Sequence, residues 1–436
     1  MRFVLKPFID LFQDPQMSLQ IIFFSLLIIL IPIALIIGPA LPDIFITLVA
    51  IYFLSQTFIN KLWEYFCNPL IIGILLFCIY ILFRAIFSES PISSLYNEGS
   101  VFYFRYLLFI MGFAYLLKKN PYLSECLLIS LFFTILVVGI DSYYQYFTGF
   151  NFLGHPIIMG QKRLTGLFVD EPIVGRFIAY LAPMLFALIF KIYGSSKKII
   201  LLSITLLVFS EVIVFLSGER APFFYISSFS LLIVIFIPKF RLVRIIGLIV
   251  TVLLIITMLE LKPETKSRML DTTINQVSST KIPFMPYSPH HEEHYIGALK
   301  IAKDNPIFGI GTNLFRYVCD RPEYVYKRSC STHPHNYYIQ LLAETGIVGL
   351  LFLIMFYGYI CYLSIKQFYF MITKNYQKLI PFNSFIFIMM ILVFWWPLIP
   401  TMSFYNNWNN VFLMLPLGFL MRYLYDNKFN GNIKDN

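Results

Sequence analysis

The sequence predicts an all-α, polytopic membrane protein. Apolar residues make up 58% of the 436 residues and charged residues only 13%, whereas an ordinary soluble domain is about 25% charged. Apolar runs of about 18–22 residues, the length that crosses a bilayer as a helix, recur along the chain. This composition could not cover a water-exposed surface, so a soluble globular class is excluded.

Twelve apolar runs are expected to be membrane spans. The first follows Arg2 and Lys6 as a signal peptide would, but it is too long for the apolar core of one and a second run follows at once. We therefore interpret it as an uncleaved first helix. The expected spans are residues 19–37, 41–58, 69–87, 100–117, 122–147, 172–190, 198–217, 221–238, 242–259, 346–365, 380–399 and 408–425.

The positive charges predict the orientation of these spans. Lysine and arginine are concentrated in the segments on the same side as the N-terminus, and the short loops on the other side hold only Lys162, Arg163 and Arg220. Because cytoplasmic loops are enriched in these residues, both termini are expected in the cytoplasm. The net charge of +10 is then a sign of topology, and no nucleic-acid partner is expected.

A long hydrophilic segment separates the ninth and tenth expected spans. Long loops in compact proteins usually carry function, and this one holds every histidine except His155. We expect spans one to nine in residues 1–259, a periplasmic loop domain in residues 260–345, and spans ten to twelve with a cytoplasmic tail in residues 346–436. An oxidising compartment would favour a disulfide between Cys319 and Cys330; two reduced, packed cysteines are the alternative.

Charged residues inside apolar spans need a reason, because each costs about 2.5–3.5 kcal/mol on insertion scales. Arg84, Arg105, Arg176 and Glu211 are such residues. The topology places all four toward the outer ends of their spans, at the depth of Arg220 in an outside turn. Guanidinium groups bind phosphate bidentately, so this set predicts a pyrophosphate site. The alternatives are that Glu211 neutralises Arg84 or Arg105, or that the long side chains reach to water.

His335 opens a polar segment that leads directly into the tenth expected span. An imidazole titrates near pH 6.5 and can accept a proton from a hydroxyl nucleophile, so His335 is the candidate general base. Glu344, nine residues later, would share its helix face and orient a partner or contact sugar. His333 is interpreted as structural or as a support for the site without contact to substrate, and a structural role is also the alternative for His335.

The run from His290 to His294 resembles a zinc motif but is not one. His291 stands where the His-Glu-x-x-His pattern requires glutamate. His291 and His294 could still share a metal, but no third ligand is specified. Binding of glycan or phosphate is favoured, a solvated loop helix is the alternative, and no metal or cofactor is expected.

These features together resemble the O-antigen ligase family and its relatives, the O-antigen polymerases and bacterial O-oligosaccharyltransferases. Twelve spans with one large periplasmic loop before the tenth match the family layout. The residues that carry the resemblance are Arg220 in Ser-Gly-Glu-Arg, the loop Pro306-x-x-Gly309-x-Gly311, and His335-Asn336 followed by Leu341, Leu342, Glu344, Thr345 and Gly346.

The sequence departs from the family pattern at one point. The family usually places an arginine a few residues before the aromatic residue that opens the helix ahead of the Pro-x-x-Gly-x-Gly loop. If Tyr295 is that aromatic residue, His291 stands at the arginine position. Either His291 or the upstream Arg268 then supplies the second phosphate contact, and this choice stays open.

The resemblance implies a GT-C-like, metal-independent, inverting glycosyltransferase. It would move an O-antigen glycan from undecaprenyl pyrophosphate to an acceptor hydroxyl, with lipid A–core as the favoured acceptor, at the periplasmic face of the inner membrane. The implied catalytic residues are His335 as general base and Arg220 as the stabiliser of the leaving pyrophosphate. The expected substrate-binding residues are His291, Arg268, Arg84, Arg105, Arg176, Glu344 and Asn336.

Two other functions remain open. An O-antigen polymerase would use the same donor with a second lipid-linked glycan as acceptor. A transporter or flippase would place polar groups near the membrane midplane on broken helices and would often show internal repeats. The sequence favours transfer over transport, because its charged residues are expected near the outer ends of the spans.

Overall fold

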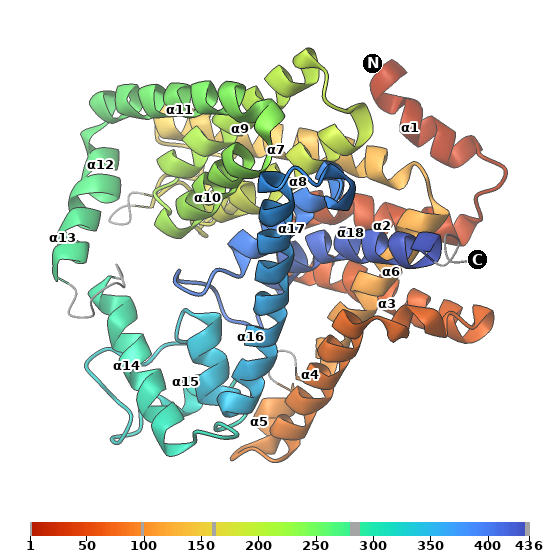
Figure 1. Cartoon of the computed structure of the whole chain (residues 1–436). Helices are drawn as coiled ribbons and strands as arrows, with labels where there is room; N and C mark the ends of the chain where they lie inside the picture. The colour runs from red at the N-terminus through yellow and green to blue at the C-terminus, as the bar shows by residue number, and fades with distance from the viewer. Residues whose placement is uncertain (1, 97–99, 159–162, 280–287, 432–436) are drawn as a thin grey trace.

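The computed structural model describes residues 2–96, 100–158, 163–279 and 288–431 and is helical throughout (Figure 1). Within these ranges the only strand-like pairing is one isolated bridge between Phe150 and Pro156. Each of the twelve expected spans coincides with a helix. These helices are α2 (Leu19–Ile37), α3 (Ala40–Asn60), α4 (Pro69–Ile86), α6 (Phe104–Lys119), α7 (Leu123–Thr148), α8 (Val174–Tyr193), α9 (Lys197–Leu216), α10 (Arg220–Phe236), α11 (Arg241–Leu261), α16 (Tyr337–Ile372), α17 (Phe382–Phe394) and α18 (Asn407–Gly431).

Nine helices within the described residues are long and apolar enough to cross a membrane, so the chain is a multi-pass membrane protein. The expected count of twelve is not confirmed. Helices α10 and α17 are apolar but shorter than the others, and α18 belongs to neither group.

Helix α8 occupies the centre of the bundle. It packs against α7, α9, α10 and α17, and nearly all of its side chains from Val174 to Phe190 are buried. Helix α11 is the opposite case, because Leu242, Ile246 and Leu253 on it are exposed. A helix that shows apolar side chains along its outer face suits contact with lipid tails rather than water.

The remaining helices are short and connect or flank the bundle. They are α1 (Arg2–Gln13), α5 (Pro91–Tyr96), α12 (Pro263–Lys266), α13 (Thr272–Ser279), α14 (Pro289–Asp304), α15 (Phe315–Val318), the π-turn Ser267–Asp271, and the 3₁₀ turns Trp63–Cys67, Val101–Tyr103, Gly166–Phe168, Pro238–Phe240 and Tyr376–Lys378.

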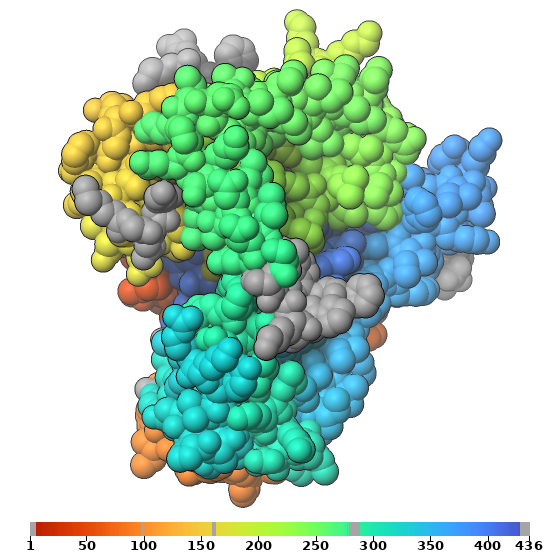
Figure 2. Space-filling view, turned by 90° about the vertical axis from the view of Figure 1, so that its left-hand side faces the viewer, coloured from red at the N-terminus to blue at the C-terminus, as the bar shows by residue number. Residues whose placement is uncertain are grey.

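The long hydrophilic segment folds into two parts. Helices α12 and α13 continue from the end of α11 along one side of the molecule (Figure 1). Helices α14 and α15 pack on the first turns of α16 around a small core of their own that includes Ile301, Leu314, Phe315 and Ala343. Figure 2 shows this second part as a lower lobe, in teal to cyan, with α11 and α13 in green above it.

Helix α16 begins at Tyr337 and is kinked at Gly346, where the tenth span was expected to begin. Gly346 has φ 67°, a conformation that glycine adopts without steric cost. The kink leaves backbone groups of α16 open, and the loop 306–311 satisfies them. Ile310 N–H donates to Ala343 O (3.2 Å), Gly311 N–H to Glu344 O (2.8 Å), and Ile347 N–H to Pro306 O (2.9 Å).

Gly309 allows this close approach of loop and helix. A Cβ at Gly309 would lie 2.3 Å from the carbonyl carbon of Glu344, far inside van der Waals contact. The Pro-x-x-Gly-x-Gly loop therefore forms backbone hydrogen bonds with α16 at its kink.

The charge pairing inside the bundle differs from the sequence expectation. Glu211 forms a buried ion pair with Arg244 of α11 and not with Arg84 or Arg105, and it accepts a hydrogen bond from Thr251 (2.7 Å). Glu211 and Arg244 are 1% and 0% exposed. Charged groups therefore lie inside the bundle, as an ion pair between α9 and α11.

Candidate functional site

Five of the six histidines come together in what we call the histidine cluster: His290, His291, His294, His333 and His335. The ring centroid of His335 lies 4.1 Å from that of His333, 5.3 Å from that of His294 and 5.4 Å from that of His291. The rings of His290 and His294 are 4.4 Å apart. Residues separated by some 40 positions in the sequence thus surround His335.

The backbone holds His335 in an unusual conformation. Its φ is 58°, in the left-handed region that a non-glycine residue adopts only at some cost. Its carbonyl accepts hydrogen bonds from Thr401 N–H (2.8 Å) and from the hydroxyl of Tyr295 (3.4 Å). Contacts from two distant segments therefore fix the residue from which the imidazole projects.

Asn336 has a structural role that differs from the substrate contact expected of it. Its side chain accepts the N–H groups of Tyr338 and Ile339 and so caps α16, which is a common role for asparagine. Its amide also donates to Pro397 O (2.7 Å). The residue is 2% exposed and directly follows His335, so it fixes the segment that bears His335, and its contact with substrate stays a prediction.

The site disfavours the charged form of His335 and His291. Burial lowers the pKa of His335 to about 4, with further lowering by His294 and by the charge of Arg176. Burial likewise lowers the pKa of His291 to about 3, with His335, His294, His290 and Arg220 adding to the effect. A neutral imidazole can accept a proton, so at pH 7 His335 is in the form that a general base requires.

A second group, which we call the arginine cluster, comprises Arg163, Arg176, Arg220 and Arg268 around the buried Glu219. Glu219 accepts the N–H of Gly175 (2.7 Å), and Arg163 lies 3.4 Å from its carboxylate. Burial raises the pKa of Glu219, while the charges of Arg163 and Arg176 oppose that rise. One carboxylate thus faces several guanidinium groups, which leaves an excess of positive charge.

The polar segment after α11 contributes Arg268 to the arginine cluster and forms hydrogen bonds with Arg220. Arg220 donates to Gln276 (2.6 Å) and Thr273 (3.4 Å) of α13, and Arg268 donates to Gly218 O (3.4 Å). Burial lowers the pKa of Arg268, as does the charge of Arg220 beside it. Two like charges held this close indicate a place where an anion would be stabilised.

The two clusters adjoin. The charge of Arg176 acts on His335, and that of Arg220 acts on His291. Of the residues proposed from the sequence, the structure therefore brings together His335, Arg220, His291, Arg268 and Arg176.

Four residues of the assembled site were missed. His290, His294 and His333 were not proposed individually as site residues, although the run from His290 to His294 was expected to bind glycan or phosphate, and Arg163 was used only to orient the spans. The sequence offered one indication of these four residues, which is that they are charged or histidine side chains in segments expected on the outer side. That signal gives a depth in the membrane but no lateral position.

Arg84 and Arg105 have partners outside the histidine and arginine clusters, so their part in a pyrophosphate site stays a prediction. Arg84 donates to Gly309 O (3.1 Å) and thereby ties α4 to the loop at the kink. Arg105 pairs with Asp43 of α3 at 2.9 Å. The physical reason is that equal depth does not imply proximity, because the helices that carry these arginines occupy different positions around the bundle.

Glu344 is also absent from the histidine cluster. It is fully buried and accepts the N–H groups of Asn313 (3.0 Å) and Phe315 (3.1 Å). Its spacing from His335 suggested a shared helix face, but His335 precedes the helix and has left-handed backbone angles. Glu344 holds the start of α15, and its contact with sugar stays a prediction.

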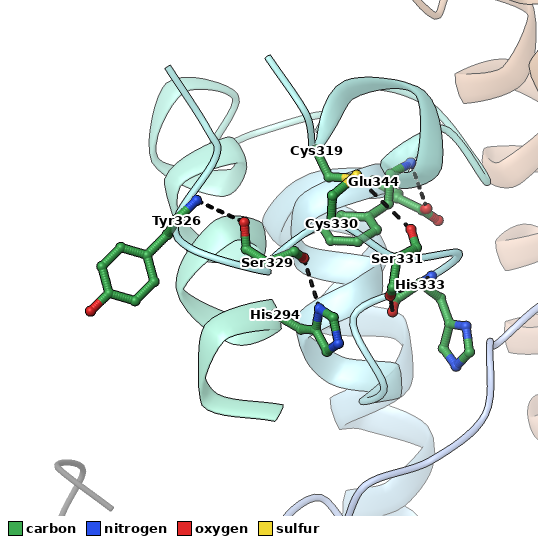
Figure 3. The surroundings of a disulfide bond; sticks show 9 residues. His294, Cys319, Tyr326, Ser329, Cys330, Ser331, His333 and Glu344 are labelled. Atoms are coloured by element: carbon green, nitrogen blue, oxygen red, sulfur yellow. Dashed lines mark hydrogen bonds between the residues drawn. A yellow bond between two sulfur atoms is a disulfide. The ribbon is translucent and has the colours of Figure 1, made fainter. Parts of the chain in front are cut away.

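Cys319 and Cys330 form a disulfide, the pair expected from the sequence. Figure 3 shows His294 and His333 on the same side of the loop that this bond closes. Ser329 O accepts a hydrogen bond from His294 Nδ1 (2.8 Å). The hydroxyl of Ser331 donates to His333 O (2.6 Å). The disulfide lies between the residues that position these two histidines.

An apolar groove of about 490 Å³ runs between α4, α6, α16 and α18. Gly73, Phe77, Tyr103, Phe352, Trp395 and Phe404 line it. The ring of Tyr337 lies 5.6 Å from Trp395 and 6.0 Å from Phe404, so the groove ends one side chain away from the segment that bears His335.

Among the described residues, no three histidine, cysteine or acidic side chains are arranged to hold a metal ion. The 3.3 Å approach of His290 Nε2 to His294 Nε2 is a hydrogen-bond distance and shows two imidazoles facing each other directly.

Residues 201–354 match a family model described as O-antigen ligase. The match runs from α9 into α16 and contains Arg220, Arg268 and the whole histidine cluster. No curated protein sequence matches the chain. The family match identifies residues 201–354 as an O-antigen ligase family domain and supports the assignment of the chain to that family.

Proposed function

We propose that the protein transfers a glycan from undecaprenyl pyrophosphate to an acceptor hydroxyl, with His335 as general base. The family domain indicates a glycosyltransferase-type enzyme that acts on a lipid-linked glycan in a membrane. The observation that carries the finer proposal is that a neutral imidazole, His335, lies within the electrostatic influence of Arg176, one of the arginines around Glu219.

The arginine cluster suits the donor's diphosphate. A guanidinium offers paired N–H donors that match phosphate oxygens, and the cluster has more positive charge than Glu219 neutralises. As the bond to the sugar breaks, negative charge grows on the diphosphate. Fixed positive groups stabilise that charge without reorganisation, and Arg220 and Arg268 occupy the part of the cluster nearest α13.

His335 suits the acceptor. The acceptor oxygen would attack the anomeric carbon from the side opposite the diphosphate, while His335 takes the hydroxyl proton. Attack from the opposite side inverts the anomeric centre. Base assistance of this kind contributes roughly 10²–10⁴ in rate. The proposed chemistry requires no metal ion, because the arginines supply the positive charge.

The apolar groove suits the lipid part of a substrate. Its lining is almost entirely apolar, and it ends beside Tyr337. The proposed topology has both termini in the cytoplasm of a cell with an inner membrane, and the segment from 260 to 345 in the periplasm. A substrate with its chain in the bilayer and its glycan in water could then reach His335.

Transfer by purified protein in lipid nanodiscs tests the proposal. Polyprenyl-diphosphate-linked glycan and lipid A–core are supplied together, and the linked product is separated on a gel. His335→Ala should lose roughly 10²–10⁴ in rate and remain inserted, whereas His155→Ala, outside the cluster, should behave as wild type. Full activity of a well-inserted His335→Ala protein would refute the role of His335.

The acceptor is tested separately. Supplying only the lipid-linked glycan should give no product if lipid A–core is the acceptor. Extension of the lipid-linked glycan in that assay would identify a polymerase instead.

A further inference from the structure

A pocket of about 240 Å³ lies at the end of the bundle away from the histidine cluster. The last turns of α16 and α18 form it, together with α17 and the connection before α17. The other ends of these three helices meet next to the segment that bears His335. There Tyr338 on α16 donates to Trp395 O at the end of α17 (2.7 Å), and Asn409 near the start of α18 donates to the hydroxyl of Tyr337. The pocket is therefore separate from the proposed transfer site.

Two lysines line this pocket, which we call the lysine pocket, and both lie over the same aromatic ring. Nζ of Lys366 is 5.9 Å from the centroid of Phe370, and Nζ of Lys378 is 5.8 Å from it. Both lysines are exposed. An ammonium group that rests on an aromatic face keeps its N–H donors for a further partner. Two such groups around one ring suit an anion that can accept from both.

The lysine pocket has no acid to neutralise these charges. No aspartate or glutamate is among the described residues that line it, and neither lysine is within ion-pair distance of a described carboxylate. Asp426 belongs to the same end of α18, but its carboxylate is paired with Arg422. Within the described part of the chain, the two positive charges therefore face the pocket without a carboxylate.

Hydrogen bonds hold the two lysines in place. The side chain of Gln367, which is 6% exposed, donates to Ile380 O (3.1 Å) and accepts the N–H of Ile380 (2.9 Å). These bonds tie the connection that carries Lys378 to the helix that carries Lys366. The positive groups are thus positioned before a ligand arrives, which reduces the ordering cost of binding.

The surroundings of the lysine pocket favour a lipid over a soluble anion. Leu363, Ile388 and Leu420 give it an apolar wall. On the adjoining surface of α16, Ile365 and Tyr369 are 67% and 60% exposed, which indicates that this end of the helix still contacts the bilayer. In the proposed topology this end faces the cytoplasm, and the cytoplasmic leaflet carries anionic lipids. A ligand here meets positive charge and apolar surface together.

We propose that the lysine pocket binds an anionic phospholipid, with its phosphate between Lys366 and Lys378 and its glycerol and upper acyl chain against the apolar wall. This site goes beyond the proposed transfer reaction and does not depend on it, because the pocket lies at the other end of α16, α17 and α18. Basic pockets between membrane helices on the cytoplasmic side are suited to such headgroups.

Native mass spectrometry of the full chain in detergent micelles tests the site. The protein is titrated with phosphatidylglycerol, and with phosphatidylethanolamine as the zwitterionic comparison. The first bound phosphatidylglycerol should be retained in preference to phosphatidylethanolamine. Lys366→Gln and Lys378→Gln should each weaken its binding about fivefold, and the double variant about 25-fold, as expected for lysines near a membrane surface. Lys374→Gln is the matched control, because Lys374 is exposed on the same connection but does not line the pocket; it should bind as wild type.

Equal affinity of wild type and the double glutamine variant for phosphatidylglycerol would overturn the proposal. Equal weakening by Lys374→Gln would also overturn it, because that result marks a general effect of net charge. Inorganic phosphate is added in a parallel titration, and displacement of the lipid by phosphate at similar concentration would show a site for a soluble anion instead. Thermal midpoints measured without added lipid check the fold. If the double variant lost its wild-type midpoint, Lys366→Gln and Lys378→Gln singly would give the same comparison.

Discussion

Arg176 is the residue at which the two clusters meet. It borders the carboxylate of Glu219 on one side, and its charge acts on His335 on the other. A single guanidinium therefore influences both the proposed leaving-group site and the proton affinity of the proposed base.

We expect Arg176→Gln to move the acid limb of the pH profile of kcat/KM to higher pH. That limb reports the pKa of the base in the free enzyme, and the pKa of His335 is lowered to about 4 by burial, His294 and Arg176. Wild-type activity should thus fall near pH 4 and not near 6.5. Removing the positive charge makes the imidazolium less unfavourable, so the pKa rises.

The pH at which kcat/KM falls does not depend on the maximum value of kcat/KM. Weaker donor binding in Arg176→Gln therefore does not obscure the result. Arg105→Gln is the control, because Arg105 pairs with Asp43 away from His335. A limb that stays in place in Arg176→Gln would show that this charge does not reach His335.

At the scale of elements, the loop closed by Cys319 and Cys330 determines where two histidines sit. Ser329 and Ser331 flank Cys330 and hold His294 and His333. Helix α14 supplies His294 from the other side, and the cap of α16 by Asn336 fixes the segment that bears His335. The cluster thus depends on three elements that meet outside the bundle.

Reduction of this disulfide should lower both stability and transfer. Loss of a cross-link of this loop length costs about 2–4 kcal/mol of folding free energy, and the freed loop no longer holds His294. Transfer rate and hydrogen exchange of residues 288–345 are measured with and without reductant. The Cys319→Ser/Cys330→Ser double variant should resemble the reduced protein and be insensitive to reductant, and Cys67→Ser should match wild type. Unchanged exchange and rate after complete reduction would contradict this role.

The groove between α4, α6, α16 and α18 makes a second prediction at this scale. A Cβ at Gly73, which lines the groove, meets no atom within 4 Å. Gly73→Trp should therefore fill the groove without disturbing the fold and raise KM for the lipid-borne substrate about tenfold, equivalent to about 1.4 kcal/mol.

Gly358→Trp provides a matched control. Gly358 on α16 is equally open but does not line the groove, so its KM should stay at the wild-type value. Equal KM values for both variants, with thermal midpoints unchanged, would exclude the groove as a lipid site.

At the scale of the whole molecule, burying neutral histidines predicts acid lability. The pKa is lowered to about 4 for His335 and about 3 for His291, against roughly 6.5 in an unfolded chain. Below pH 6.5 the unfolded chain therefore binds more protons than the folded one. The free energy of unfolding then falls as pH decreases from about 6.5 towards these folded-state values.

The thermal midpoint should accordingly drop between pH 7 and pH 5, as measured by the unfolding of the protein in nanodiscs. His291→Gln should flatten this dependence, because it removes one of the groups that must be neutral in the folded state. His155→Gln should keep the wild-type slope. Identical slopes for His291→Gln and wild type would show that the cluster does not control acid stability.

Composition and apolar run length determined the helical membrane fold, because any chain this apolar must satisfy its backbone within helices when it crosses lipid. The same reasoning located every helix of the bundle. It could not settle how many of them cross, since α10 and α17 are shorter than the nine spanning helices and α18 belongs to neither group. The sequence also showed the Pro306-x-x-Gly309-x-Gly311 motif and placed the start of the tenth span at Gly346, but the kink at Gly346 and its pairing with the glycine loop came only from the structure.

Tertiary structure alone decided which charged residues meet. The sequence places Arg84, Arg105, Arg176 and Arg220 at similar depth, yet only the last two join the candidate site, because helix order around the bundle is set by packing between distant segments. Glu211 likewise forms an ion pair with Arg244 on α11 and not with Arg84 on α4 or Arg105 on α6. His290 and His294 reach His335 only because α14 folds back onto α16, and no local pattern records that contact.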